Sequence, residues 1–200
     1  MTLQTITSLS TKKPLYEGDF PSFTACLEQA VADKTNLTGA DLKNRNLSNA
    51  CLDDGLLEGA DFSGTNLTGA NLSEASLSGA TLAEADLYNT CLAYADLNRC
   101  NFDRAEFGGT DITRANINNA SFSTLSCFSL DFARTSSMND CRFTGMNGQS
   151  LIFSAPPIVI RGLGKNLVVL TPEKWIIGMD VLPYPQQKFP SLFKLQNIRI

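Results

Sequence analysis

A large apolar residue recurs every five positions through the middle of the chain. Residues 35–124 divide without insertion into 18 five-residue units, such as TNLTG, ADLKN and ANLSE. The third residue of every unit is Leu, Phe or Ile, and the first is small in 17 of the 18, Arg45 being the exception. Neither an α-helix, with 3.6 residues per turn, nor a strand, which alternates every two residues, has this period.

A period of five predicts a coil with straight sides. One large and one small residue per unit would face inward, and the other three would face water. Four such sides close a turn of 20 residues, and backbone hydrogen bonds stack the turns about 4.8 Å apart. The pattern therefore predicts an all-β solenoid with a core of stacked Leu and Phe side chains.

The repeated A(D/N)LXX unit resembles that of the pentapeptide-repeat family, and the resemblance covers 35–124 without a break. It implies a right-handed quadrilateral β-helix, whereas the periodicity itself indicates a square coil of unspecified hand. The resemblance also implies one candidate function, since some members of that family mimic DNA and bind DNA gyrase.

The segments on either side of the repeat differ from it. Residues 1–34 are expected to form an N-terminal arm and a cap helix over 22–33, in which Ser22 is the N-cap and apolar residues recur at helical spacing. Such a helix would cover the open end of the solenoid. The domain 35–154 comprises the regular coils and, over 125–154, degraded ones. Residues 155–200 hold six of the eight prolines and three short apolar runs. They are expected to form two or three short strands and an extended tail that dock a partner or cap the column.

The composition excludes several kinds of chemistry. Histidine is absent, which removes Ser-His-Asp triads and His-containing zinc sites, and none of the six cysteines forms a CxxC motif. We therefore predict no enzyme, no catalytic residue, no metal and no cofactor. The net charge of −4 argues against direct binding of nucleic acid. Without a signal sequence or an apolar run of membrane length, the chain is expected in the cytoplasm. It is expected to be encoded by a bacterium or a phage, and a role as a virion component is one form that its function could take.

The second residue of a unit is Asp or Asn in 11 of 18 units. A carboxylate array of this kind on a convex column lacks the cleft that a glycosidase or metal site needs, so these residues are expected to shape corners by local hydrogen bonds. Arg45, the one large residue at a first position, is expected to reach out beside the cap helix to a carboxylate, because a buried unpaired guanidinium is costly.

The surface suggests two classes of function. The first is a rigid protein-binding or assembly module that docks a partner, or a second copy, through its sides and its C-terminal segment. Its interface candidates are exposed aromatic and apolar residues: Tyr88, Tyr94, Trp175, Phe189, Leu192 and Phe193. The alternative is a DNA mimic that binds gyrase or another topoisomerase through its acidic residues: Asp41, Asp53, Asp54, Asp61 and Glu74. Summing charges on each side reveals no continuous acidic stripe, and gyrase-binding members tend to dimerise through a C-terminal helix that this Pro-rich end does not predict.

Overall fold

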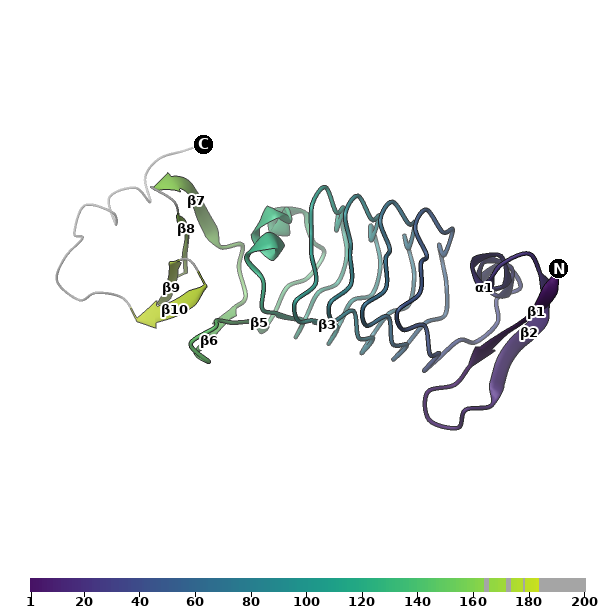
Figure 1. Cartoon of the computed structure of the whole chain (residues 1–200). Coiled ribbons are helices and arrows are strands. Elements are labelled where there is room, and N and C mark those ends of the chain that lie inside the picture. The colour runs from purple at the N-terminus through teal and green to yellow at the C-terminus, as the bar shows by residue number, and fades with distance from the viewer. Residues whose placement is uncertain (164–165, 172–173, 178, 184–200) are drawn as a thin grey trace.

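The repeat forms a column of stacked coils in a computed structural model that describes residues 1–163, 166–171, 174–177 and 179–183. Parallel bridges join residues 20 apart along the column, from Asn36↔Leu56 to Asp96↔Asn116. The next contact of this kind, between Asn101 and Ser121, extends into a pair of short parallel strands, β3 (Asn101–Phe102) and β4 (Ser121–Phe122). Figure 1 shows the coils side by side, with a hairpin and a helix at one end and a small sheet at the other. Four units therefore make one coil, as the period predicts.

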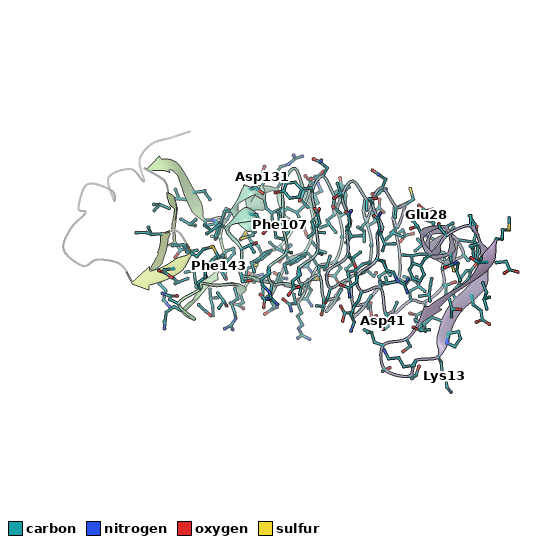
Figure 2. The ribbon with its side chains drawn as sticks, in the orientation of Figure 1. Lys13, Glu28, Asp41, Phe107, Asp131 and Phe143 are labelled. Atoms are coloured by element: carbon teal, nitrogen blue, oxygen red, sulfur yellow. The ribbon has the colours of Figure 1, made fainter. Side chains whose placement is uncertain are left out.

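The core of the column is the stack of third-position side chains. Every one of them, from Leu37 to Phe122, is at most 3% exposed. Small first-position residues are buried beside them, which leaves room for the large side chains. In the C-terminal half the Leu stack gives way to aromatic rings, and the Phe102 and Phe122 rings stack at 5.3 Å. Phe107 and Phe143 point into the column (Figure 2).

Each corner of a coil is a four-residue turn whose third member has positive φ. At one corner the Ala80 N–H donates to the Leu77 carbonyl at 2.8 Å, and Gly79, at the fifth position, has φ of 70°. Fifth-position residues from Gly39 to Asn119 all share this left-handed conformation, glycine or not. A type II turn requires positive φ at that place. The turns explain why Gly and Asn recur there.

Aspartate and asparagine at the second position stabilise these corners. Their side-chain Oδ1 accepts the backbone N–H two residues further on, as Asp61 does from Ser63 at 2.9 Å. Ten of the eleven make this bond: Asn36, Asn46, Asp61, Asn66, Asn71, Asp86, Asp96, Asn101, Asp111 and Asn116. The expectation of a local structural role is confirmed for them.

Two buried threonines add hydrogen bonds inside the column. The Thr65 hydroxyl donates to the Leu42 carbonyl and the Thr90 hydroxyl to the Leu67 carbonyl, both at 2.8 Å. The Leu67 carbonyl also accepts a turn N–H, from Ala70. Among the described residues the Leu42 carbonyl has the threonine as its one donor. The two threonines therefore differ in what their loss would leave unpaired.

The N-terminal arm contains a hairpin that the sequence pattern did not predict. Strand β1 (Thr2–Thr7) pairs antiparallel with β2 (Pro14–Phe20). The connecting segment has neither Gly nor Asn to signal a turn, and Lys12 supplies the positive φ, at 56°. Helix α1 (Phe23–Ala32) follows, with the Ser22 hydroxyl accepting the Ala25 N–H, so the predicted helix is confirmed.

Hydrogen bonds join the hairpin and α1 to the first coil. The Asp41 N–H donates to the Thr7 carbonyl at 2.8 Å, and the Thr24 hydroxyl donates to the Asn46 carbonyl at 3.2 Å. A Glu28 carboxylate oxygen accepts the Cys51 N–H at 2.9 Å. Backbone groups that would pair with a preceding coil therefore find partners in the arm. Within it, the Tyr16 hydroxyl donates to Asp33 at 2.6 Å.

Arg45 reaches the surface beside α1, but the expected carboxylate partner was wrong. Its guanidinium carbon lies 4.0 Å from the centre of the Phe23 ring, and it forms no ion pair within the described part of the chain. A guanidinium stacked on a ring keeps its charge in water while covering apolar surface. The ring of the helix residue therefore does what we assigned to an acid.

The column ends where one extra residue enters the coil. Ser121 pairs with Arg142, 21 positions on, and two 3-10 turns at Leu125–Ser129 and Phe132–Arg134 occupy this coil. Strand β5 (Cys141–Thr144) continues the stack in parallel, and β6 (Ser150–Phe153) then pairs with it antiparallel. The reversal of direction stops further coils from stacking in the same way.

A four-stranded antiparallel sheet follows in the order β10-β9-β8-β7: β7 (Ile158–Leu163), β8 (Asn166–Leu170), β9 (Lys174–Ile177) and β10 (Asp180–Pro183). We expected two or three strands, so the last one was missed. The sheet contacts the β5–β6 turn, where the Met146 N–H donates to the Met179 carbonyl at 2.9 Å. A Cβ on Gly145 would lie 2.7 Å from that carbonyl oxygen. Val169, Ile176 and Val181 belong to the same buried cluster as the column core.

Candidate interaction surface

Two exposed tyrosines flank one side of the column, which we call the tyrosine side. Tyr88 is 45% exposed and Tyr94 is 58% exposed. They occupy the two corners of the unit 90–94, which carries Cys91, partly exposed, between them. Four stacked units, joined by parallel bridges at their second positions, build this side: 50–54, 70–74, 90–94 and 110–114.

Glycine lets one of the rings lie flat on the column. Gly108 is one coil above Tyr88, and a Cβ there would collide with the Tyr88 ring. The fifth-position residues of this corner are Asn49, Gly69, Asn89 and Gly109, without any charge. The corner therefore presents a smooth, uncharged surface around one aromatic ring.

The opposite corner carries an ordered series of charges. Its fifth positions, one coil apart, are Asp54, Glu74, Tyr94 and Arg114, and the Arg114 N–H donates to the carbonyl of Arg134 in the next coil. All five side chains are exposed. We call them the charged corner. Acids lie on the N-terminal side of Tyr94 and bases on the C-terminal side.

The bases of the charged corner have neighbours of their own. The Arg114 guanidinium carbon lies 6.0 Å from the centre of the Tyr94 ring. Asp111 accepts hydrogen bonds from the Thr113 hydroxyl and backbone N–H, which lower the pKa of its carboxyl, and the positive charge of Arg134 acts in the same direction. The side is therefore ionised and polar around the two rings.

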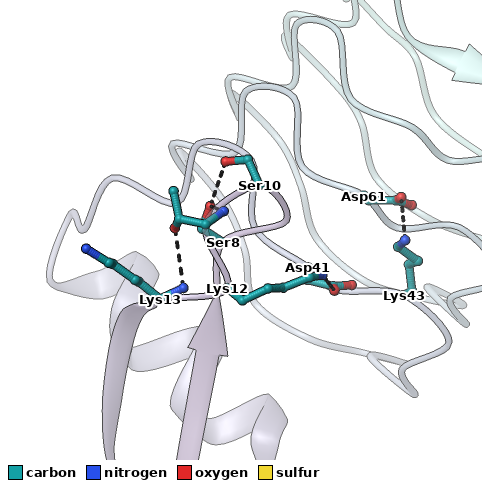
Figure 3. Close-up of polar contacts among 8 residues, drawn as sticks. Ser8, Ser10, Lys12, Lys13, Asp41, Lys43 and Asp61 are labelled. Carbon is teal, nitrogen blue, oxygen red and sulfur yellow. Dashed lines mark hydrogen bonds and ion pairs between the residues drawn. The ribbon is translucent and has the colours of Figure 1, made fainter.

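Most of the predicted acidic surface is neutralised by lysines. Lys12 lies 3.1 Å from Asp41 and Lys43 lies 3.3 Å from Asp61. Figure 3 shows both ion pairs. Lys34 lies 2.6 Å from Asp54. Within the described residues the other two candidates, Asp53 and Glu74, form no ion pair. The structure brings Asp53, Asp54 and Glu74 to the tyrosine side and separates Asp41 and Asp61 from them.

The remaining interface candidates belong to the C-terminal segment. The backbone of Trp175 belongs to β9, and Phe189, Leu192 and Phe193 lie outside the described residues. The sequence reasoning missed Arg114 and Arg134 as surface features, because it summed charges over each side. Sorting fifth positions by steps of 20 residues would have revealed their order along the axis.

Other chemistry finds little support in the described part of the chain. No group of three or more Cys, Asp or Glu residues there is placed to hold a metal ion. All six cysteines are free, and burial raises the pKa of the Cys100 thiol to about 12. An open groove of about 490 Å³ lies between α1 and the first coil, lined by Glu28, Cys51 and Asp53 among others. No helix in the described ranges is long and apolar enough to cross a membrane.

Comparison with family profiles decides the family. The profile described as "Pentapeptide repeats" matches in eight copies at residues 25–59, 56–93 and 90–124, which together make half of the chain. The chain belongs to the pentapeptide-repeat family. Members of this family are right-handed quadrilateral β-helices and are generally structural rather than enzymatic.

Solved structures of pentapeptide-repeat proteins are also similar to this chain. Rfr23 from the cyanobacterium Cyanothece 51142 is 29% identical over 36% of this chain and 49% of its own, with a TM-score of 0.36. HetL from Nostoc sp. strain PCC 7120, involved in heterocyst differentiation regulation, is 30% identical over 44% and 39%, with a TM-score of 0.38. A protein of the Arabidopsis thaliana thylakoid lumen is 26% identical over 52% and 75%, with a TM-score of 0.34.

The chain thus spans half or less of the length of the first two structures. No curated protein matches it. The family assignment rests on the repeat match.

Proposed function

We propose that this chain is a non-enzymatic protein-binding module that presents the tyrosine side to a protein partner. The observation that carries the proposal is the pair of exposed rings, Tyr88 and Tyr94, on a column over 35–124 in which Leu56 is the one other exposed large apolar side chain. Tyrosine is enriched in interfaces, because a rigid ring buries much area at little cost in side-chain entropy.

The proposed architecture makes the surface rigid. We take the column to be a right-handed quadrilateral β-helix, with the hairpin and α1 as its N-terminal cap and 155–200 as a separate C-terminal segment. The bonds from Thr7, Thr24 and Glu28 to the first coil support a capping role. The core residues that the C-terminal sheet shares with the column support capping at that end too. Each coil packs on the coils directly before and after it. A side of the column is therefore held in shape by this stacking and contains no long loop.

Affinity capture from cells of the source organism tests the function. The full-length protein is compared with Tyr88→Ala/Tyr94→Ala and with a matched control, Ser63→Ala, on another side. Proteins that the wild type and the control retain, and the double variant loses, support the proposal. An unchanged set of captured proteins would refute it. The same experiment after fractionation checks the expected compartment, the cytoplasm, against a virion.

DNA mimicry remains the competing function, and the paired lysines on Asp41, Asp54 and Asp61 weigh against it. A mimic needs an acidic surface that opposes the basic DNA channel of a topoisomerase. Supercoiling by gyrase with and without the full-length protein separates the two functions. Inhibition that Asp53→Asn/Glu74→Gln relieves, and Tyr88→Ala/Tyr94→Ala leaves intact, would favour mimicry.

A further inference from the structure

We propose that the partner on the tyrosine side is a second copy of this chain, docked antiparallel. This inference deepens the proposed function and rests on it. The argument starts from the order of charges along the charged corner, where two acids precede Tyr94 and two bases follow it.

The charges are antisymmetric about the level of Tyr94. Coils stack about 4.8 Å apart, so Glu74 lies one coil below Tyr94 and Arg114 one coil above it. Asp53 and Asp54 lie two coils below, and Arg134 lies two coils above. A two-fold axis perpendicular to the column at the level of Tyr94 exchanges these heights.

In that arrangement four charged side chains, Asp53, Glu74, Arg114 and Arg134, each meet a charge of the opposite sign. Glu74 of one copy faces Arg114 of the other, and Asp53 faces Arg134, each pair occurring twice because the interface is isologous. A parallel pair, with its two-fold axis along the column, would instead place the charged corner of each copy against the uncharged corner of the other, so that Glu74 and Arg114 find no opposite charge. The order of charges therefore selects a second copy in the antiparallel direction.

The uncharged corner permits the close approach that this contact needs. The same two-fold axis places Gly69 opposite Gly109, while Tyr88 and Tyr94 meet their own counterparts near the axis. Small residues opposite small ones and rings opposite rings leave no bulky side chain in the way. The area of one column side is modest, so we expect a reversible dimer that forms as concentration rises.

Charge reversal tests the pairing directly. Sedimentation equilibrium of the full-length protein is measured over a range of concentrations for the wild type, Glu74→Arg and Arg114→Glu. Each single variant should weaken the dimer at least tenfold, because like charges then face each other twice. The double variant Glu74→Arg/Arg114→Glu should recover the wild-type dissociation constant, and an equimolar mixture of the two single variants should form a mixed dimer. Lys43→Glu, on another side, serves as the charge-matched control.

Thiol cross-linking checks the direction independently. Cys91 lies on the coil of Tyr94, so a short bismaleimide should link Cys91 to Cys91. Cys51 lies two coils away, and its two copies would be about 19 Å apart along the axis. Cross-linking should therefore persist in Cys51→Ser and disappear in Cys91→Ser.

Three outcomes would overturn the inference: a monomer at every concentration, a dimer indifferent to both reversals, or a dimer that the double variant fails to restore. If the protein is monomeric but the tyrosine variant still loses a captured protein, the dimer is wrong and the proposed binding function stands.

Discussion

Replacing two adjacent leucines separately tests the five-residue register. Leu57 occupies a third position and is 0% exposed, whereas Leu56, at the second position, is 39% exposed. Leu57→Ala and Leu56→Ala remove the same three carbons from neighbouring residues of one unit. Any difference between them reports which side chain faces the core.

The expected magnitudes follow from burial. Three carbons at about 0.8 kcal/mol each amount to about 2.4 kcal/mol of lost transfer free energy when the side chain is fully buried. A cavity between stacked coils adds to this, so Leu57→Ala should lower the free energy of unfolding by about 2–5 kcal/mol. Leu56→Ala should cost no more than about 1.5 kcal/mol, because part of the side chain already contacts water and no closed cavity forms.

Urea denaturation followed by circular dichroism measures both free energies. The comparison requires equal m-values, since a changed slope would mean that the coils no longer unfold together. Equal shifts of the two midpoints, or a larger shift for Leu56→Ala, would contradict the assignment of inward and outward positions.

Four further substitutions test other parts of the fold. Thr65→Val should cost about 1–3 kcal/mol in urea denaturation and Thr90→Val only about 1 kcal/mol, because only the first leaves a buried carbonyl without a donor. In a spectroscopic titration, the hydrogen bond to Asp33 should raise the pKa of Tyr16 from 10.0 to about 12, and Asp33→Asn should bring it back down. The bond stabilises the fold below pH 10 and is lost as the pH rises through about 12; at the acid end it is lost as the pH falls through the lowered pKa of Asp33. Gly145→Ala should loosen the C-terminal sheet, and faster proteolysis near Pro156 would reveal it, whereas an unchanged rate would contradict the close contact.

The repeat could be interpreted from the sequence because its interactions are periodic. A residue at a third position, such as Leu77, has the same neighbours in kind at every coil, so a single rule assigns its burial. The helix α1 was also predictable, since an N-cap serine and apolar residues at helical spacing act within a few residues of each other. Local and repeated signals therefore determined the coil, its 20-residue turn and the helix.

Other features depended on contacts that no local pattern specifies. The turn of the N-terminal hairpin uses Lys12 in a left-handed conformation, which Gly or Asn usually signals. Arg45 needed an outward partner, but the choice of the Phe23 ring over a carboxylate depended on where α1 lies against the first coil.

The charged corner shows the same division between sequence and structure. The spacing of 20 residues already placed Glu74 and Arg114 on one side of the column. Which side chains remain exposed, and which acids lysines neutralise, depends on distances between segments far apart in the chain. The sequence by itself determined the column, because backbone pairing between coils follows from one short period. Only the tertiary structure decided what its ends and its surface present, because those contacts form once along the chain and have no period.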